Sequence, residues 1–322
     1  MSEYLIRRIL QSLLTLFLVS VVSFGLIHAA PGGPTTMLMR PGQSPEMVKQ
    51  QMHNLGLDRP VHIQYLQWLK RTVSGDFGNM FRSNRPVSKL LWPALTNTLT
   101  LMTTAWLITL LIAIPWGIYN STRQYGISDN VASVLGYIGF SLPAFWFAII
   151  LQEIFSLKLG WMPLSGLHTM GRTDFPDLLQ HMVLPVITLV IINLAGYLKY
   201  SRAAMLDVLG QDYVRTARAK GVPERKVIFR HALRNALIPI ITILGMDLVT
   251  VVAGATLTET VFNVPGMGRL FFDMAVGREY SVIMAITIIV AVVVVLGNLL
   301  ADILYAIVDP RVRLTGKGVT SA

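Results

Sequence analysis

Apolar stretches of about twenty residues recur along the chain, and shorter polar segments separate them. A helix needs about twenty apolar residues in a row to cross the hydrocarbon core of a membrane. The pattern predicts six such spans, at residues 9–30, 97–119, 131–157, 181–201, 237–260 and 281–308. Pro143 and Pro185 fall inside two of these spans, where neighbouring helices can satisfy the freed carbonyls. We therefore expect kinked helices within a bundle.

Composition supports an all-α polytopic membrane protein. The chain has 322 residues, of which 53% are hydrophobic and 14% charged, and this argues against a soluble fold. It has no cysteine, which excludes disulfides, thiolate metal sites and a cysteine nucleophile. The formal charge of +10 is unevenly distributed, and in a membrane protein such asymmetry reports orientation and does not indicate a nucleic-acid partner.

The distribution of Lys and Arg predicts which loops are cytoplasmic. Residues 199–234 carry nine of these cations, whereas residues 158–180 and 263–280 carry two each. Cytoplasmic loops are enriched in Lys and Arg, so the 199–234 segment is expected on that side. Six spans place both termini there as well, with the following terminal cations: Arg7, Arg8, Arg311, Arg313 and Lys317.

The spans divide the chain into four parts. Residues 1–30 form a first span that we expect to be retained, because its apolar run exceeds the roughly 7–15 residues of a signal-peptide core. Residues 31–95 form an extracytoplasmic segment, and residues 96–308 form a five-span core with a cytoplasmic loop at 203–236. Residues 309–322 form a cytoplasmic tail. The eight cations of residues 31–95 do not change this topology, since long translocated loops follow the charge rule poorly.

The extracytoplasmic segment is expected to contain two helices. Ser44 and Pro45 begin one that stops near Gly56, and a second begins around Pro60. The second carries an apolar stripe at helical spacing, formed by Ile63, Leu66, Trp68 and Leu69. This stripe fits a docking surface for an outer partner. It fits equally a segment that packs on the bundle or lies at the lipid headgroups through Tyr65 and Trp68.

The basic stretch DYVRTARAKGVPERKVIFRHALRNALIPI, residues 212–240, separates two apolar segments. Asp212 is a suitable N-cap for a helix of about two turns, and Gly221 can take the left-handed position that ends it. Pro223 then fits the first position of another helix that leads into the fifth span. Such a short helix is unstable alone, so it must dock to persist. Ala217 and Ala219 are small and the neighbouring side chains are long and basic, as suits a coupling element pressed into a cytoplasmic partner. A loop that sets topology and binds anionic lipid is the alternative, and the Gly and Pro punctuation favours docking.

This stretch resembles the EAA loop of permease subunits of ATP-binding-cassette (ABC) importers. Aligned on Gly221, the chain keeps Ala217, Gly221 and Leu233 of the general pattern. It departs from that pattern at Arg215, Thr216, His231 and Arg234. The longer wording DYVRTARAKG and RHALRNALIP is similar to the dipeptide/oligopeptide/nickel subfamily, where those departures are usual. Further resemblances follow in order along the chain: RRIL, APGGP, LGLDRPVHIQYLQWL, GDFG, TETVFNVPGMGRL and LADILYAIVDPRVR. The chain most resembles the first of the two paired permeases of a peptide importer.

The resemblance implies the membrane domain of a type I importer in a prokaryotic inner membrane. In that family the short helix sits in a cleft of a cytoplasmic ATPase and transmits the closure of the ATPase to the spans. Carried over by position, the coupling residues are Asp212, Arg215, Ala217, Arg218 and Gly221. The implied partners are a second homologous permease, one or two kinds of ATPase subunit and an extracytoplasmic substrate-binding protein. ATP hydrolysis would then reside in the partner subunits, and the chain itself is not expected to be an enzyme.

Ionisable and amide side chains within the spans are candidates for the translocation path. Such groups are costly in a membrane and usually face the bundle interior or water. Asp247 in the fifth span is the first candidate, followed by Asn193, Glu259, Asn298 and Asp302. Glu259 and Asp302 lie near span ends, where we expect water to reach them.

Other function classes find less support in the sequence. The six histidines form no HExxH motif, and no catalytic constellation or cofactor motif is visible, which argues against an intramembrane enzyme. A nickel site built from His or Met stays open. An ion-driven carrier would be expected to show inverted repeats or clustered acids, and neither is clear. Nickel, heme or oligosaccharide remain alternative cargoes, because in this family specificity rests largely with the binding protein.

Overall fold

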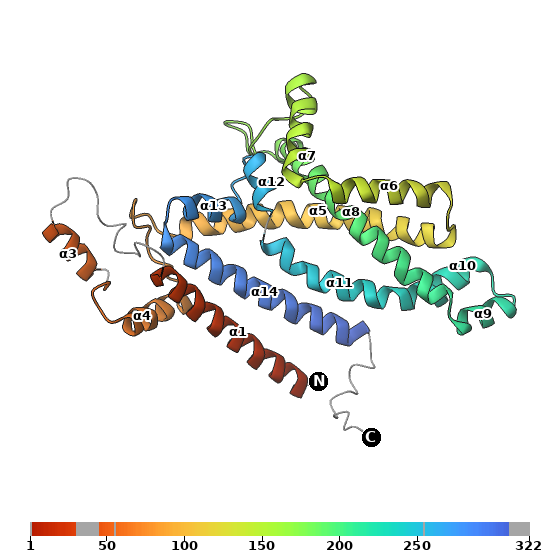
Figure 1. The fold of residues 1–322 in the computed structure, drawn as a ribbon, viewed down its shortest axis with the longest axis horizontal. Helices are drawn as coiled ribbons and strands as arrows, with labels where there is room; N and C mark the ends of the chain where they lie inside the picture. Colours follow the sequence, from red (N-terminus) through yellow and green to blue (C-terminus); the bar gives the residue numbers. More distant parts are fainter. Residues whose placement is uncertain (1, 30–44, 55, 254, 309–322) are drawn as a thin grey trace. The chain divides into compact units, whose positions relative to one another are not determined.

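The computed structural model describes residues 2–29, 45–54, 56–253 and 255–308 (Figure 1). These residues form helices joined by short connections, with one isolated antiparallel bridge between Asn79 and Pro86. The chain divides into two compact units. Unit 1 contains Met1–Thr98 and Pro265–Leu296, and unit 2 contains Leu99–Val264 and Gly297–Ala322. The APGGP motif at 30–34, Ser44, and the tail cations Arg311, Arg313 and Lys317 lie outside the described residues.

Two of the helices, α5 and α14, contribute to both units. In unit 1 the helices are α1 (Ser2–Ala29), α3 (Pro45–Asn54), α4 (Val61–Val73), the first part of α5 (Ser88–Thr122), α13 (Met267–Val276) and most of α14 (Tyr280–Val308). Unit 2 contains the rest of α5, α6 (Ile127–Ser141), α7 (Ala144–Leu151) with the π-helix η1 (Gln152–Lys158), and α8 (Phe175–Leu209). It continues with α9 (Asp212–Ala219), α10 (Glu224–Lys226) with the π-helix η2 (Val227–Ala232), α11 (Leu233–Ala253) and α12 (Thr256–Val261).

Five helical segments are long and apolar enough to cross a membrane, and a bent pair raises the number to six if it counts as one span. The five segments are Ile6–Ala29, Ser88–Thr122, Phe175–Leu209, Glu224–Gly245 and Tyr280–Leu300. Each overlaps a span predicted from the sequence. The bent pair, Ile127–Ser141 and Ala144–Lys158, corresponds to the remaining predicted span.

The prediction of a merely kinked span at residues 131–157 is wrong. The helix breaks between Ser141 and Ala144, and the direction of its axis changes by 103° at the break. Leu142 takes an extended conformation with ψ of 124°, because a residue before proline is disfavoured in the helical region. The predicted span 237–260 is also divided. Helix α11 ends at Ala253, and residues 256–261 form the separate helix α12.

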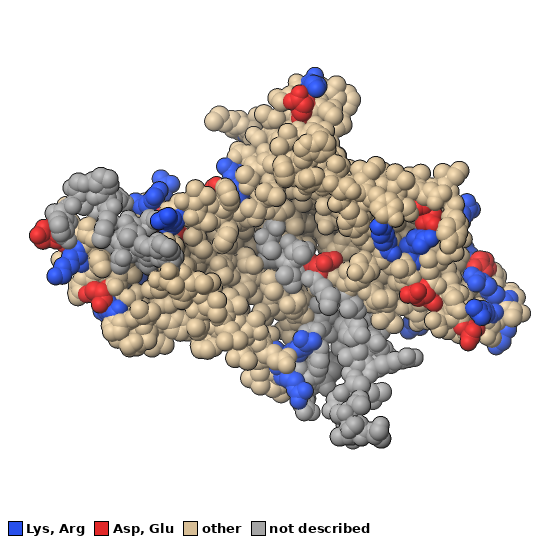
Figure 2. Space-filling view, viewed as in Figure 1, with Lys and Arg blue, Asp and Glu red and all other residues tan. Residues whose placement is uncertain are grey.

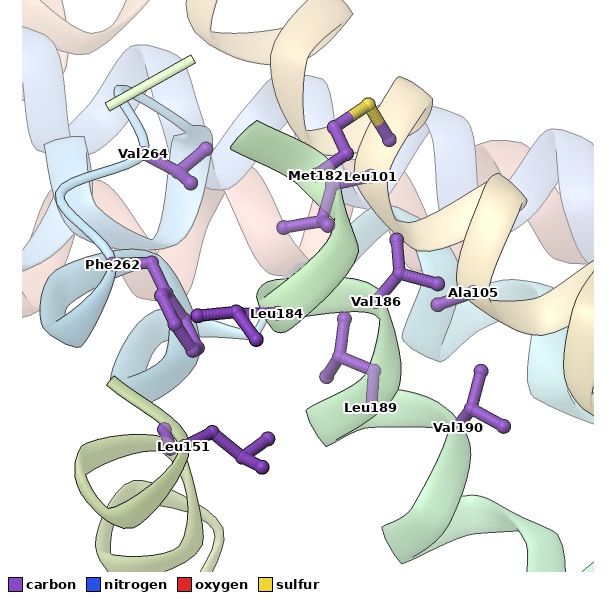
Figure 3. Close-up of a cluster of buried hydrophobic side chains, with 11 residues drawn as sticks. Leu101, Ala105, Leu151, Met182, Leu184, Val186, Leu189, Val190, Phe262 and Val264 are labelled. Atoms are coloured by element: carbon purple, nitrogen blue, oxygen red, sulfur yellow. The ribbon is translucent and has the colours of Figure 1, made fainter. Parts of the chain in front are cut away.

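The largest buried cluster of unit 2 joins α5, α7 and α8 with the chain that follows α12 (Figure 3). Leu101 of α5 and Leu184 and Val186 of α8 are buried there, together with Phe262 and Val264. In the close-up the ring of Phe262 lies beside Leu184 (Figure 3). Within a membrane, lipid is as apolar as these side chains, so their close van der Waals packing stabilises the contact. The cluster therefore fixes the end of α12 against α8.

Helix α4 packs on the first span within unit 1. Helices α3 and α4 confirm the two predicted helices, with Pro60 directly before α4. Tyr65 forms a 2.8 Å hydrogen bond with Ser20 of α1, and the rings of Tyr65 and Trp68 lie 5.4 and 5.6 Å from that of Phe24. Leu66, a member of the predicted stripe, is exposed. These contacts confirm that Tyr65 and Trp68 pack on the bundle, whereas docking of an outer partner stays a prediction.

Candidate functional site

Helix α9 occupies the loop that the sequence marks as a coupling element. It begins at Asp212, but its N-cap is Gln211, whose ψ of 149° lies outside the helical region, so the expected Asp212 cap is wrong by one residue. The helix ends as expected. Gly221 has a φ of 72°, and the amides of Gly221 and Val222 donate to the carbonyls of Arg218 and Ala217 at 2.9 and 3.2 Å. This pair of hydrogen bonds is the Schellman motif, which favours glycine at its left-handed position.

The inner face of α9 is built into unit 2. Val214 and Ala217 are three residues apart, so they lie on one face of the helix, and both are buried against Val227 of η2. Val208 and Leu209 at the end of α8 pack on the same cluster. The sequence places Ala217 among the coupling contacts as a small residue that enters a groove. In the structure the methyl group of Ala217 is buried against the chain's own helices, and its role as a coupling contact stays a prediction.

The outer face of α9 is polar and mostly basic. Arg215 lies 3.8 Å from Asp212, and both side chains are largely exposed, so this pair contributes little stability. Arg218 donates hydrogen bonds to Glu224 at 2.7 and 3.1 Å, which raise the pKa of the Arg218 guanidinium and close the turn around Gly221. Tyr213 accepts a 2.7 Å hydrogen bond from Asn235 of α11. Asp212, Arg215 and Arg218 therefore present exposed charge while the turn below them is held in place.

A basic hollow lies beside this turn. Its volume is about 770 Å³, and its lining consists of Pro223, Arg225, Lys226, Phe229, Arg230 and Arg234. In the space-filling view, Lys and Arg side chains gather at the end of unit 2 that carries α9 and α10, with a few acidic residues among them (Figure 2). This end of unit 2 thus combines a short, firmly held helix with a cationic concave surface.

A second candidate site is an open cavity of about 500 Å³ in unit 2, and two of the residues that line it, Phe140 and Tyr200, are exposed. Asp247 of α11 and Asn193 of α8 both line it, so two of the predicted path residues come together. The wall also contains Trp106, Tyr197 and Tyr200, which the sequence analysis does not single out. Tyr197 follows Asn193 by four residues, a spacing that places both on one helical face and could have indicated it. No sequence pattern links Trp106 of α5 to this face.

Hydrogen bonds connect the polar groups of this cavity. The indole Nε1 of Trp106 donates to the hydroxyl of Tyr197 at 2.9 Å, and this hydroxyl donates to Asp247 Oδ2 at 2.6 Å. Asn193 donates its amide hydrogen to the carbonyl of Leu189 at 2.7 Å. Trp106, Tyr197 and Asp247 are partly buried and Asn193 is exposed, and the bond from Tyr197 holds the Asp247 carboxylate in a defined position.

The other candidate path residues lie elsewhere. Glu259 of α12 is fully buried and is absent from the cavity wall, so the expectation that water reaches it is wrong. The break after α11 explains this difference, since it turns the residues after Ala255 into a separate helix packed in unit 2. Asn298 is exposed on α14. The side chain of Asp302 lies outside the described residues.

The chain is similar to known membrane transport components over nearly its whole length. Residues 110–314 match the family of the binding-protein-dependent transport system inner membrane component, and residues 1–103 match the N-terminal domain of such components. The oligopeptide transport system permease protein AppB of Bacillus subtilis (strain 168) is 45% identical over 316 residues, covering 97% of this chain and 100% of that protein. The dipeptide transport system permease protein DppB of Escherichia coli (strain K12) is 35% identical over 336 residues, covering 97% and 99% respectively.

The fold has a counterpart among solved structures. The MetNI methionine ABC transporter, in an inward-facing conformation, aligns with a TM-score of 0.54 over 69% of this chain and 97% of that chain. At 18% identity this likeness concerns the fold alone, which is that of a type I importer transmembrane domain. With two matched segments that together span almost the entire sequence, the chain belongs to the inner membrane components of binding-protein-dependent transport systems, as a multi-pass protein of the prokaryotic plasma membrane.

Proposed function

We propose that this chain is the permease subunit of an ATP-driven peptide importer. It would form the path for dipeptides or oligopeptides together with a second, homologous permease. A cytoplasmic ATPase would dock on α9, and an extracytoplasmic binding protein would deliver the cargo. The main support is the similarity to oligopeptide and dipeptide permeases over 97% of the chain.

The construction of α9 supports its role as the link to an ATPase. Its inner face is anchored to α8 and η2, and Tyr213 connects it to α11. A force on the exposed basic face would therefore reach α8 and α11, which also line the Asp247 cavity. The helix can shift the membrane domain between states only if its docking partner binds those states differently. Closure of the ATPase around α9 would supply this difference.

The path itself is proposed to include the cavity of Asp247 and Asn193. A membrane-embedded carboxylate is expensive, and it is usually kept where water or a substrate passes. Glu259 is not proposed as a path residue in this conformation, because its side chain is fully buried in unit 2.

The transport assignment is tested with the purified complex. The chain is isolated with the subunits that co-assemble, reconstituted in liposomes, and assayed for ATP hydrolysis and peptide uptake with and without the binding protein. ATP-dependent uptake of short peptides is expected. Co-purification of no ATPase would contradict the coupling role, and uptake driven by an ion gradient in the absence of ATP would identify a secondary carrier.

The docking face is tested by reversing charge on α9. Arg215 and Lys220 are exposed, so the double variant Arg215→Glu/Lys220→Glu leaves the packing of α9 intact. Like-charge contacts across an interface cost several kcal/mol, so we expect peptide uptake to fall at least about tenfold. Retention of the ATPase on the affinity-purified permease is measured alongside. Arg123→Glu, an exposed cation in the connection between α5 and α6, is the matched control and should transport normally. Normal uptake by the double variant would contradict docking through this face.

A further inference from the structure

The basic hollow beside the turn at Gly221 carries positive charge that no described residue neutralises. Its lining contains three arginines, one lysine and a phenylalanine, and no Asp or Glu: Pro223, Arg225, Lys226, Phe229, Arg230 and Arg234. From its charge, its exposed ring and its place on a membrane span, we infer that the hollow binds the phosphate headgroup of an anionic phospholipid. This inference goes beyond the proposed peptide transport and does not depend on the cargo.

The four cations of the hollow are unpaired within the described part of the chain. None of their side chains forms an ion pair or a hydrogen bond with another described residue. Other arginines of unit 2 differ in this respect. Arg202 lies 2.7 Å from Asp129, and Arg218 lies 2.7 Å from Glu224. Like charges gathered around one hollow repel one another, so an anion bound there lowers the electrostatic energy of all four.

The π-helix η2 brings the cations to one side of the chain. In a regular α-helix, residues five apart such as Arg225 and Arg230 would point about 140° away from each other. A π-helix forms its hydrogen bonds between residues five apart, which brings such residues to the same side. Val227 and Ala232 are buried within unit 2, and α9 packs on Val227. The cations therefore occupy the exposed side of η2, separate from its contact with α9.

The hollow lies where a membrane span begins. Glu224–Gly245 is one of the segments long and apolar enough to cross a membrane, and no charged residue follows Arg234 until Asp247. Arg234 thus marks the start of the apolar part. At 1.5 Å per residue, Arg225 lies about 13 Å further along the helix. The headgroup region of one leaflet is roughly 5–7 Å deep, so the four cations extend through this region. Their long side chains can reach phosphates there.

Phe229 favours a lipid over other anions. Its side chain is 59% exposed and lines the hollow together with the cations. Aromatic rings beside Lys and Arg are typical of helices that contact lipid, where the ring enters the acyl boundary and the cations stay among the headgroups. Guanidinium groups bind phosphate oxygens through two parallel hydrogen bonds. A soluble anion or an acidic protein surface would satisfy the cations but would not account for the exposed ring.

The test measures lipid binding to the purified complex of this chain and its co-assembling subunits by native mass spectrometry. The complex is titrated in detergent with phosphatidylglycerol and, separately, with phosphatidylcholine. Each cation near an anionic lipid contributes about fivefold to binding. We therefore expect one phosphatidylglycerol to bind at least about tenfold more tightly than phosphatidylcholine. Equal affinities for the two lipids would overturn the inference.

Variants connect the lipid preference to the hollow. Arg225→Gln/Arg230→Gln changes two exposed side chains, so packing is retained while the affinity for phosphatidylglycerol should fall at least about tenfold. Arg225→Lys/Arg230→Lys keeps the charge and should retain most of the affinity. Arg7→Gln/Arg123→Gln removes two exposed cations elsewhere and should bind like the unmodified chain. A preference that survives in the first variant, or an equal loss in the Arg7 and Arg123 control, would refute the site.

Other occupants of the hollow give different results. If the hollow contacts the ATPase, Arg225→Gln/Arg230→Gln would lose the ATPase on affinity purification and keep its preference for phosphatidylglycerol. If it holds a soluble anion, inorganic phosphate at constant ionic strength would displace the bound lipid. Either result would overturn the inference. We expect the lipid to resist phosphate, and Phe229→Ala to bind phosphatidylglycerol about threefold more weakly because the apolar contact is lost.

The failure of this inference can be told apart from the failure of the transport proposal, because lipid binding is measured without substrate. Peptide import by a complex without a lipid preference would refute the lipid site alone. A lipid preference in a complex that imports no peptide would refute the transport proposal alone.

Discussion

At the scale of single residues, Gly117 of α5 lies where α5 and α8 pack too closely for a larger side chain. A Cβ atom at Gly117 would lie 2.7 Å from Ser201 Cβ and 2.8 Å from the carbonyl oxygen of Leu198, both in α8. Overpacking of this kind typically costs about 1–3 kcal/mol, which exceeds the gain of about 0.5–1 kcal/mol when alanine replaces a helical glycine. We expect Gly117→Ala to lower the melting temperature of the purified complex. This temperature is the point at which half of the complex is no longer monodisperse after heating.

Gly25→Ala in α1 provides the control for that variant. A Cβ atom at Gly25 would have no neighbour within 4 Å, so only the helix propensity changes and the melting temperature should stay the same or rise. If Gly117→Ala melts no lower than Gly25→Ala, then α5 and α8 do not approach as closely as the structure shows.

Single residues also show how far sequence reasoning reaches. The cost of ionisable and amide side chains in a membrane indicates Asp247 and Asn193, and both line one cavity in the structure. The partner of Arg202 is not predictable in this way. Arg202 donates two 2.7 Å hydrogen bonds to Asp129, which is 73 positions away and almost fully buried. A rule that counts cations in loops assigns Arg202 to topology, because it contains no information about contacts between distant segments.

At the scale of elements, the turn after α9 depends on one backbone conformation. Gly221 has a φ of 72°, and a Cβ atom there would meet nothing within 4 Å, so a substitution strains the backbone without a steric clash. A non-glycine residue in this region costs about 1–2 kcal/mol. We expect Gly221→Ala to lower peptide uptake by roughly fivefold or more through a less stable α9, with normal membrane insertion.

Two further substitutions separate this backbone effect from a general loss of glycine. Asparagine tolerates the left-handed region, so Gly221→Asn should retain more uptake than Gly221→Ala. Gly210 precedes α9 with a φ of −78°, which any residue adopts, and Gly210→Ala should transport normally. Equal uptake by all three variants would mean that the left-handed turn does not limit coupling.

Elements marked by Gly and Pro are predictable, while the hydrogen-bond pattern inside a helix is not. The sequence predicts α9, its end at Gly221 and the new helix after Pro223, because these residues restrict or extend the allowed backbone angles. It does not predict the π-helices η1 and η2. Hydrophobic periodicity is nearly the same for i→i+4 and i→i+5 hydrogen bonding over one turn, so the pattern cannot distinguish them. Pro143 is recognised as a perturbation, but the angle of 103° depends on packing that the local sequence does not encode.

At the scale of the whole molecule, the bent pair α6 and α7 decides the topology. If the pair crosses the membrane, the chain has six spans and both termini are cytoplasmic. If it re-enters, the chain has five spans and the loop after η1 returns to the cytoplasmic side. The cation counts favour the first arrangement, since residues 158–180 carry two Lys or Arg and residues 199–234 carry nine.

The absence of cysteine makes a direct topology experiment possible, because single cysteines can be introduced without a background signal. Met170 lies in the loop after η1 and is fully exposed, and Lys220 is exposed at the end of α9. We expect Met170→Cys to react with a membrane-impermeant maleimide in intact spheroplasts, and Lys220→Cys to react only after permeabilisation. With the N-terminus in the cytoplasm, a re-entrant pair and five spans would leave Met170 inside and carry Lys220 outside, because α8 still crosses the membrane. Met170→Cys would then react only after permeabilisation and Lys220→Cys would react in intact spheroplasts, which would place the nine cations of residues 199–234 outside the cytoplasm, against the charge bias. Reaction of both only after permeabilisation would require α8 not to cross, in conflict with its 35 residues and mean hydropathy of 2.0. The six-span arrangement is the one in which the charge bias, the length of α8 and the bent pair agree.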